Sequence, residues 1–136
     1  SNIDQKGISK LRYIENLYCH DNRNINNVNH LKNTLKVLLC GGDCGIDQDG
    51  ISQLECLEEL ECRLNNKIND VNHLKNTLVC LDCSYYSGID QNGKSQLECL
   101  GKLDCYDNGK INNVNHLKET LKILNCNGYC GIDQNG

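Results

Sequence analysis

Hydrophobic residues recur along the chain in a short, fixed pattern. Each instance has Leu or Ile, then Leu three residues later, Cys two residues after that, and Ile six residues beyond the Cys. The two-residue spacing of Leu and Cys predicts a short β-strand, because side chains at i and i+2 point to the same face. Six cysteines mark six instances at alternating intervals of 21 and 22 residues: Cys19, Cys40, Cys62, Cys83, Cys105 and Cys126. We therefore expect six strands whose leucines and cysteines face one core.

Pairs of these instances form a longer repeat of 43 residues, which runs three times without a gap, over 8–50, 51–93 and 94–136. Residues 1–7 echo the end of the first copy, so we interpret them as the tail of another copy. Periodicity of this kind is typical of a solenoid, in which each coil buries its apolar edge against the next. We expect one repeat array over 1–136, a fragment of a longer protein without capping repeats.

The polar segments between the strands are expected to cross the opposite, convex side as turns, 3-10 helices or short α-helical pieces. In every second coil an asparagine follows the marker cysteine by three residues, where its amide can bond turn backbone groups. These asparagines are Asn22, Asn65 and Asn108. In the other coils that place holds Asp43, Tyr86 and Tyr129, so the sequence predicts an asparagine ladder that is half missing.

The motif Leu-x-x-Leu-x-Cys-x-x-Asn-x-x-Ile, as in residues 57–68, resembles the leucine-rich repeat signature with Cys at one strand position. The 21/22-residue period is similar to the short repeats of internalins and phosphatase regulators. The abundance of Asn, Lys and Cys is similar to that in repeat proteins of amoebae and giant viruses. The resemblance implies an α/β solenoid, a right-handed superhelix with a concave parallel sheet of six strands and convex turns.

Composition excludes several classes of function. Pro, Met, Trp and Phe are absent, so the core must be aliphatic, built from 19 Leu with Ile, Val and Cys. The net charge of −4 argues against a nucleic-acid binder, which normally carries a basic surface. No apolar run approaches the ~18 residues of a membrane span. We therefore expect neither nucleic acid nor membrane as a partner.

The eleven cysteines suggest a disulfide or metal protein, but their spacing argues against both. The six marker cysteines are expected to be structural, because free Cys packs as a small hydrophobe. Cys80 and Cys83 should face opposite sides of a strand, and Cys44 and Cys130 lie four coils apart, beyond disulfide reach. Bridges between the marker cysteines of adjacent coils remain open. The odd number of cysteines favours a reduced, cytoplasmic setting, with association with a virion as the alternative.

Three histidines recur once per 43 residues, about 10 Å apart by the strand spacing, which is too far for one zinc site. They are His30, His73 and His116, each followed two residues later by Lys32, Lys75 or Lys118. A basic convex row is one interpretation, and we favour the other, a solvated face that caps turns. No phosphate loop, nucleophile elbow or pocket-forming carboxylate pair is present. We therefore expect no enzyme activity, no cofactor and no metal.

Comparison of the three copies separates two surfaces. Eight of the ten columns that begin at residues 26–35 are identical in all copies, whereas none of the eight columns expected on the concave side is invariant. Concave positions either tolerate change because they touch only water, or have diverged because they contact a partner. We favour the second, since solenoids bind on their concave face. The residues expected to contact a basic, apolar-rimmed protein or peptide are Tyr18, His20, Leu39, Glu59, Glu61, Arg63, Asp82, Tyr85, Lys102, Asp104, Tyr106 and Asn125.

Two other functions are kept as alternatives. Without capping repeats, exposed apolar ends would favour end-to-end self-association, as in a fibre or a capsid-associated component. A cysteine-based metal or redox store is the weaker alternative.

Overall fold

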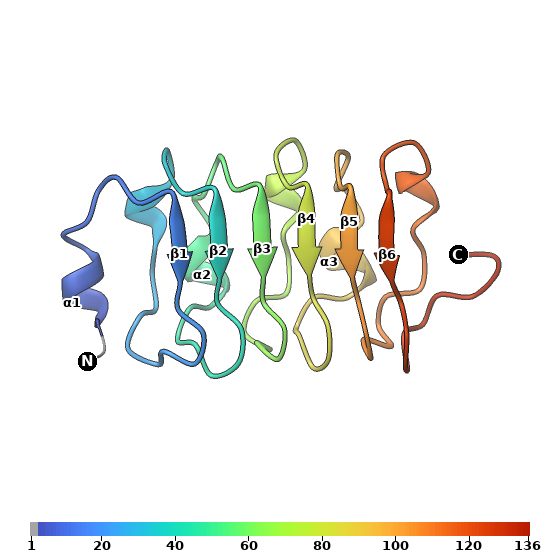
Figure 1. The fold of residues 1–136 in the computed structure, drawn as a ribbon, viewed down its shortest axis with the longest axis horizontal. Helices are drawn as coiled ribbons and strands as arrows, with labels where there is room; N and C mark the ends of the chain where they lie inside the picture. Colours follow the sequence, from blue (N-terminus) through green and yellow to red (C-terminus); the bar gives the residue numbers. More distant parts are fainter. Residues whose placement is uncertain (1–2) are drawn as a thin grey trace.

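The computed structural model describes residues 3–136, which form a single row of stacked coils (Figure 1). Each coil contributes one three-residue strand, and the six strands form one parallel sheet in the order of the chain. The strands are β1 (Asn16–Tyr18), β2 (Val37–Leu39), β3 (Glu59–Glu61), β4 (Cys80–Asp82), β5 (Lys102–Asp104) and β6 (Ile123–Asn125). The predicted α/β solenoid with six sequential parallel strands is confirmed.

The strand register aligns the central leucines in one column. Leu17 lies opposite Leu38, and the same pairing continues through every strand to Leu124. The central leucines of β2 to β5 are fully buried at 0 % exposure, and the marker cysteines from Cys19 to Cys105 are buried beside them. Each buried leucine stabilises the fold by about 1.5–3 kcal/mol. Cys126, in the last coil, is half-buried.

The side opposite the sheet alternates between two kinds of turn. Short α-helices occur at α1 (Gln5–Ile8), α2 (Gln48–Ile51) and α3 (Gln91–Lys94). Between them lie the 3-10 helices η1 (Asn29–Leu31), η2 (Asn72–Leu74) and η3 (Asn115–Leu117). An aspartate caps each α-helix by accepting a 2.8 Å hydrogen bond from a glycine N–H, as Asp47 does from Gly50. The two kinds of turn therefore alternate with a period of two coils.

Hydrogen bonds between coils explain why the convex sequence is nearly identical in the three copies. Gln48 Oε1 accepts from the backbone N–H groups of Asn69 (2.9 Å) and Asp70 (3.0 Å), and Gln48 Nε2 donates to the Asp70 carbonyl (2.8 Å). Gln5 and Gln91 make the same contacts in their copies. This glutamine ladder was not predicted from the sequence.

The convex histidines are also engaged with neighbouring coils. His30 Nε2 lies 3.0 Å from the Ile8 carbonyl, and His73 Nε2 lies 3.1 Å from the Ile51 carbonyl. These contacts confirm the interpretation that the two histidines cap turns.

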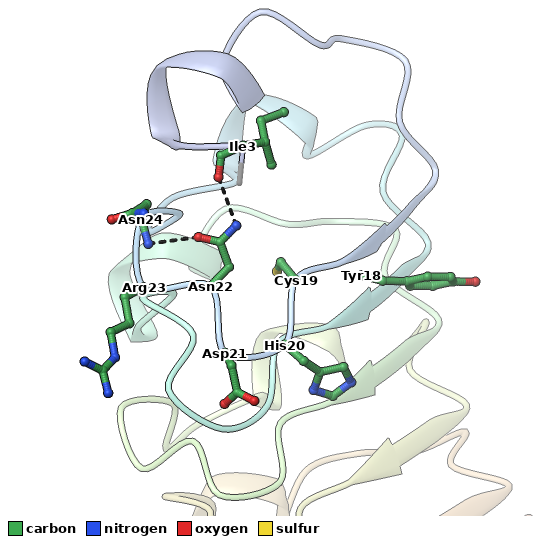
Figure 2. Close-up of a pocket in the computed structure, with 8 residues that line it drawn as sticks. All are labelled: Ile3, Tyr18, Cys19, His20, Asp21, Asn22, Arg23 and Asn24. Carbon is green, nitrogen blue, oxygen red and sulfur yellow. Dashed lines mark hydrogen bonds between the residues drawn. The ribbon is translucent and has the colours of Figure 1, made fainter. Parts of the chain in front are cut away.

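The asparagine ladder forms where it was predicted. Asn65 Nδ2 donates to the carbonyls of Cys40 (2.9 Å) and Ile46 (3.1 Å), and Asn65 Oδ1 accepts from the Lys67 N–H (3.0 Å). Asn108 makes the equivalent bonds, and Asn22 Nδ2 donates to the Ile3 carbonyl (2.9 Å; Figure 2). Each asparagine therefore ties its coil to the preceding one.

In the intervening coils, the residue that points inward where the other coils have the ladder asparagine is not the one predicted. Asp43, Tyr86 and Tyr129 are exposed, and the next residue of the turn points inward instead. That residue is Cys44, Ser87 or Cys130, of which the first two are fully buried. The gaps expected in the ladder are thus occupied by thiols and a hydroxyl.

One buried position departs from the repeat. Lys94 stands where the other copies have Ile8 and Ile51, and like Ile51 it is 0 % exposed. Its Nζ donates to the Asn113 carbonyl at 2.9 Å. Burial lowers the pKa of this lysine, because the ammonium is removed from water. A charged group thus lies in an otherwise aliphatic column.

Candidate functional site

All twelve residues predicted to bind a partner lie on one side of the molecule, the exposed side of the sheet. We call this surface the sheet face. Its central row follows the strand register, one residue after the central leucine of each strand: Tyr18, Leu39, Glu61, Asp82, Asp104 and Asn125. A second row precedes the leucines and includes Glu59 and Lys102, and a third follows the marker cysteines and includes His20, Arg63 and Tyr106. Figure 2 shows Tyr18 projecting away from the first coil at one end of this face.

The centre of the sheet face is acidic. Glu61, Asp82 and Asp104 are direct register partners on β3, β4 and β5, so their backbones are about 4.8 Å apart. Together with Glu59, they line a hollow of about 170 Å³, into which Lys102 brings the one positive charge among the lining residues. Like charges in adjacent strands destabilise the sheet when nothing neutralises them. A cationic group in this hollow would relieve that repulsion.

Glu61 is largely enclosed, with 18 % of its side chain exposed. Its Oε2 lies 3.0 Å from His20 Nε2, and its Oε1 lies 3.2 Å from Arg63 Nε. The second contact is an ion pair only, because the buried Oε1 accepts no hydrogen bond from residues 3–136. Burial raises the pKa of Glu61, and the negative charge of Asp82 raises it further. The positive charges of His20 and Arg63 act in the opposite direction. The Oε1 atom of Glu61 can therefore accept a hydrogen bond from a bound group.

An apolar rim borders the acidic centre. The rings of Tyr85 and Tyr106 pack with centroids 5.3 Å apart and planes tilted by 53°, an arrangement that aromatic pairs favour. Leu64, which occupies in the preceding coil the place that Tyr85 has in its own, is 48 % exposed. Leu64 and Tyr85, with His20 and Arg63, line a second hollow of about 350 Å³. Charged and apolar groups thus adjoin on the middle coils.

Leu64 and Tyr85 have left-handed backbones, with φ of +62° and +60°. The equivalent residue in the other coils is glycine or aspartate, at Asp21, Gly42, Asp107 and Gly128, all with positive φ. An ordinary L-residue in this conformation costs about 1–2 kcal/mol. Strained residues with exposed side chains are characteristic of contact sites. The turn geometry therefore identifies Leu64 as a candidate contact residue, which the sequence did not single out.

Replacing Leu64 by glycine should raise the free energy of unfolding by about 0.5–1 kcal/mol, because glycine adopts a positive φ without strain. Urea titration of the folded chain measures this change. The control is Leu11→Gly, which removes a similarly exposed leucine (43 %) that lacks a positive φ. That substitution should lower stability, and a loss of stability in both variants would contradict the assignment of strain.

A larger hollow, about 640 Å³, lies at the first coil, where Tyr18 and His20 of the sheet face are among its lining residues (Figure 2). Its polar groups already serve the fold: Asn22 bonds to the Ile3 carbonyl, and Asn24 donates its N–H to Asn22 Oδ1 at 3.0 Å. Arg23, on its margin, is paired with Asp43. Because these polar groups are already paired within the protein, few remain free to bind a ligand in the hollow. The sheet face is therefore the stronger candidate.

Residues 3–136 include no cluster of three or more His, Cys, Asp or Glu side chains able to hold a metal ion. Among these residues no helix has the length and apolar character needed to cross a membrane. All eleven cysteines are free thiols. Two thiol pairs lie close together, Cys19 with Cys44 and Cys105 with Cys130, and neither was predicted from the sequence. The repeated 25-residue separation of Cys19 from Cys44 and of Cys105 from Cys130 was the available signal.

Comparison with protein-family models and with curated proteins found no match for this chain. The functional argument therefore depends on the chemistry of the sheet face itself. The contrast between identical convex residues and a variable sheet face contributes less than expected, since the inter-coil hydrogen bonds account for much of the convex identity.

Proposed function

We propose that this chain is a non-catalytic scaffold of the short leucine-rich repeat type, which binds a basic protein segment on its sheet face. The observation that carries the proposal is the row of Glu61, Asp82 and Asp104 on neighbouring strands, with an under-satisfied acceptor at Glu61. Complementary charge provides specificity and a fast association rate. The reduced, cytoplasmic setting inferred from the cysteines stays a prediction.

The geometry of this row favours an extended peptide that crosses the strands. Three carboxylates at about 4.8 Å intervals span about 10 Å, the length of roughly three extended residues. Alternate side chains of such a peptide point the same way, so two basic residues separated by one residue would face the acidic row. An apolar residue beside them would contact Leu64 and Tyr85, whose side chains remain exposed. Aromatic and basic groups of this kind dominate binding energy at interfaces.

The charge-reversed variant E61K/D82K/D104K should bind a synthetic peptide with alternating arginines and a neighbouring leucine roughly 100-fold more weakly than the natural chain, because attraction becomes repulsion. Isothermal titration calorimetry at low and physiological salt measures the affinity. Circular dichroism checks that the variant is folded.

The matched control makes the same change in net charge on the other side of the molecule. Glu55, Glu98 and Glu119 are exposed there. The variant E55K/E98K/E119K should bind the peptide within about threefold of the natural chain, because these charges are more than a Debye length from the acidic row and salt screens them. Equal weakening by both triple variants would show non-specific attraction and overturn the proposal. The mass in solution is measured in parallel, and a mass that grows with protein concentration would favour end-to-end assembly instead.

A further inference from the structure

Two pairs of thiols connect adjacent coils. Cys19 Sγ lies 3.6 Å from Cys44 Sγ, and Cys105 Sγ lies 3.2 Å from Cys130 Sγ. The pairs occupy the same place in the first and third copies of the repeat. In the second copy, Cys62 Sγ lies 3.6 Å from Ser87 Oγ, so a hydroxyl replaces one thiol at unchanged spacing. The chain therefore contains two complete pairs and one incomplete pair in the same scaffold.

The two thiols of the first pair, Cys19 and Cys44, differ in pKa. The hydrogen bond from Cys19 lowers the pKa of Cys44 to about 7, helped by the N–H groups of Ile46 and Gly45 and the charge of Lys67. The same interaction raises the pKa of Cys19. At neutral pH, Cys44 is consequently the nucleophile of the pair, because the thiolate is the reactive form.

Buried cysteines without a thiol partner differ from these pairs. Cys40 and Cys83 are 0 % exposed, and burial raises the pKa of both thiols. They should remain protonated and inert. In the second pair, Cys105 is buried but Cys130 is half-buried, which gives a small oxidant direct access to one sulfur. Thiol pairing therefore distinguishes four of the eleven cysteines from the rest, and partial exposure adds to it only at Cys130.

We infer that Cys19–Cys44 and Cys105–Cys130 are two modification sites, at which a small hydroperoxide oxidises each thiol pair to a disulfide that links adjacent coils. The sulfur atoms must approach by roughly 1–1.5 Å to reach the ~2.05 Å of a disulfide, a movement within the scope of side-chain rotation. Each link would join one coil to the next through the place that the asparagine amide fills in the alternate coils.

The chemistry balances with hydrogen peroxide as the oxidant. The Cys44 thiolate attacks one peroxide oxygen, the O–O bond breaks, and a sulfenic acid and hydroxide form. The Cys19 sulfur then attacks the Cys44 sulfur, the S–O bond breaks, and the thiol proton leaves with the hydroxyl group as water. Each pair loses two electrons and two protons, and one peroxide becomes two waters. A thiol reductant reverses the link by exchange.

Oxidation would affect the two ends of the sheet face differently from its centre. The links join the coil of β1 to that of β2 and the coil of β5 to that of β6. Glu61 and Asp82 of the acidic row lie between the links, in the copy that carries Ser87, whereas Asp104 lies on β5, in the second linked pair of coils. The inference does not depend on the proposed binding function, because its test is chemical.

The test treats the folded full chain with dilute hydrogen peroxide, blocks the remaining thiols by alkylation, and maps linked peptides by mass spectrometry. We expect the loss of four of the eleven thiols, with links at the two pairs, and recovery of all thiols after reduction. Cys44→Ser and Cys130→Ser should each abolish one link without unfolding the chain, since serine is the natural residue at position 87.

The variant Ser87→Cys completes the middle pair and should add a third link, to Cys62. The same mapping in urea should give scattered links, which shows that the folded arrangement directs the pairing. Intermolecular links, or oxidation confined to the half-buried Cys56 and Cys99, would overturn the inference. The inference would also be overturned if the four thiols of the two pairs stayed reduced in the folded chain, or if the marker cysteines Cys40 and Cys83 formed a link.

Discussion

Replacement of Asn65 by alanine is expected to lower the free energy of unfolding by about 3–4 kcal/mol. The substitution removes two donors to the Cys40 and Ile46 carbonyls and the acceptor of the Lys67 N–H. Asn65 is 1 % exposed, so water cannot replace these bonds. An unsatisfied buried backbone group costs about 1–3 kcal/mol, and the carbonyls of Cys40 and Ile46 would both be left unpaired. Urea denaturation followed by circular dichroism measures the loss.

Two variants separate the hydrogen bonds from other effects of the substitution. Asn66→Ala, at the exposed neighbouring position, should change stability by less than about 0.5 kcal/mol. Asn65→Asp preserves size but replaces the amide donor by an acceptor, so it should destabilise at least as much as alanine. A loss below about 1 kcal/mol in Asn65→Ala would refute the structural role assigned to the ladder.

Replacement of Lys94 by isoleucine is expected to raise the free energy of unfolding by about 2 kcal/mol at pH 7. The equivalent positions already hold Ile8 and Ile51, so the column accepts this shape. The Asn113 carbonyl would not be left unpaired, because Gln91 Nε2 also donates to it at 3.0 Å. Thermal or urea denaturation of both proteins provides the comparison.

The gain should depend on pH in a defined direction. Burial lowers the pKa of Lys94 from its ordinary value of 10.5, so the unfolded chain binds the proton more tightly. The stability of the natural chain therefore rises with pH between the lowered pKa and about 10.5. The advantage of the isoleucine variant is greatest below this window and narrows across it. The control Lys75→Ile, at an exposed site, should show no such dependence. A destabilised Lys94→Ile chain at neutral pH would contradict the prediction.

The sequence was sufficient to predict the strands because their pattern is local. Leu and Cys two residues apart specify which face is buried, and the 21/22-residue period specifies which strands are neighbours. The same pattern placed Glu61, Asp82 and Asp104 in one row, since register follows from the aligned leucines. Whether these residues bind a partner is still a prediction.

The features that were missed depend on turn geometry, which a repeat alignment does not encode. Alignment placed Asp43 in the position of Asn22, yet the turn directs Cys44 inward. The separation of Cys19 from Cys44 then depends on how the turn curves back over the previous coil. The strain at Leu64 was hidden for the same reason, since only backbone angles reveal it. The buried state of Lys94 was foreseeable from its alignment with Ile8 and Ile51, but a lysine in a core column conflicts with ordinary burial preferences.

The alternation of amide-filled and thiol- or hydroxyl-filled coils constrains how such an array can evolve in length. Asn65 rests on carbonyls of a coil that itself has no ladder amide, and the α and 3-10 turns alternate in step with it. Loss of a single coil would bring two coils of the same kind into contact and mismatch both the donors and the turns. We therefore expect duplications and deletions in such an array to add or remove whole coil pairs of 43 residues.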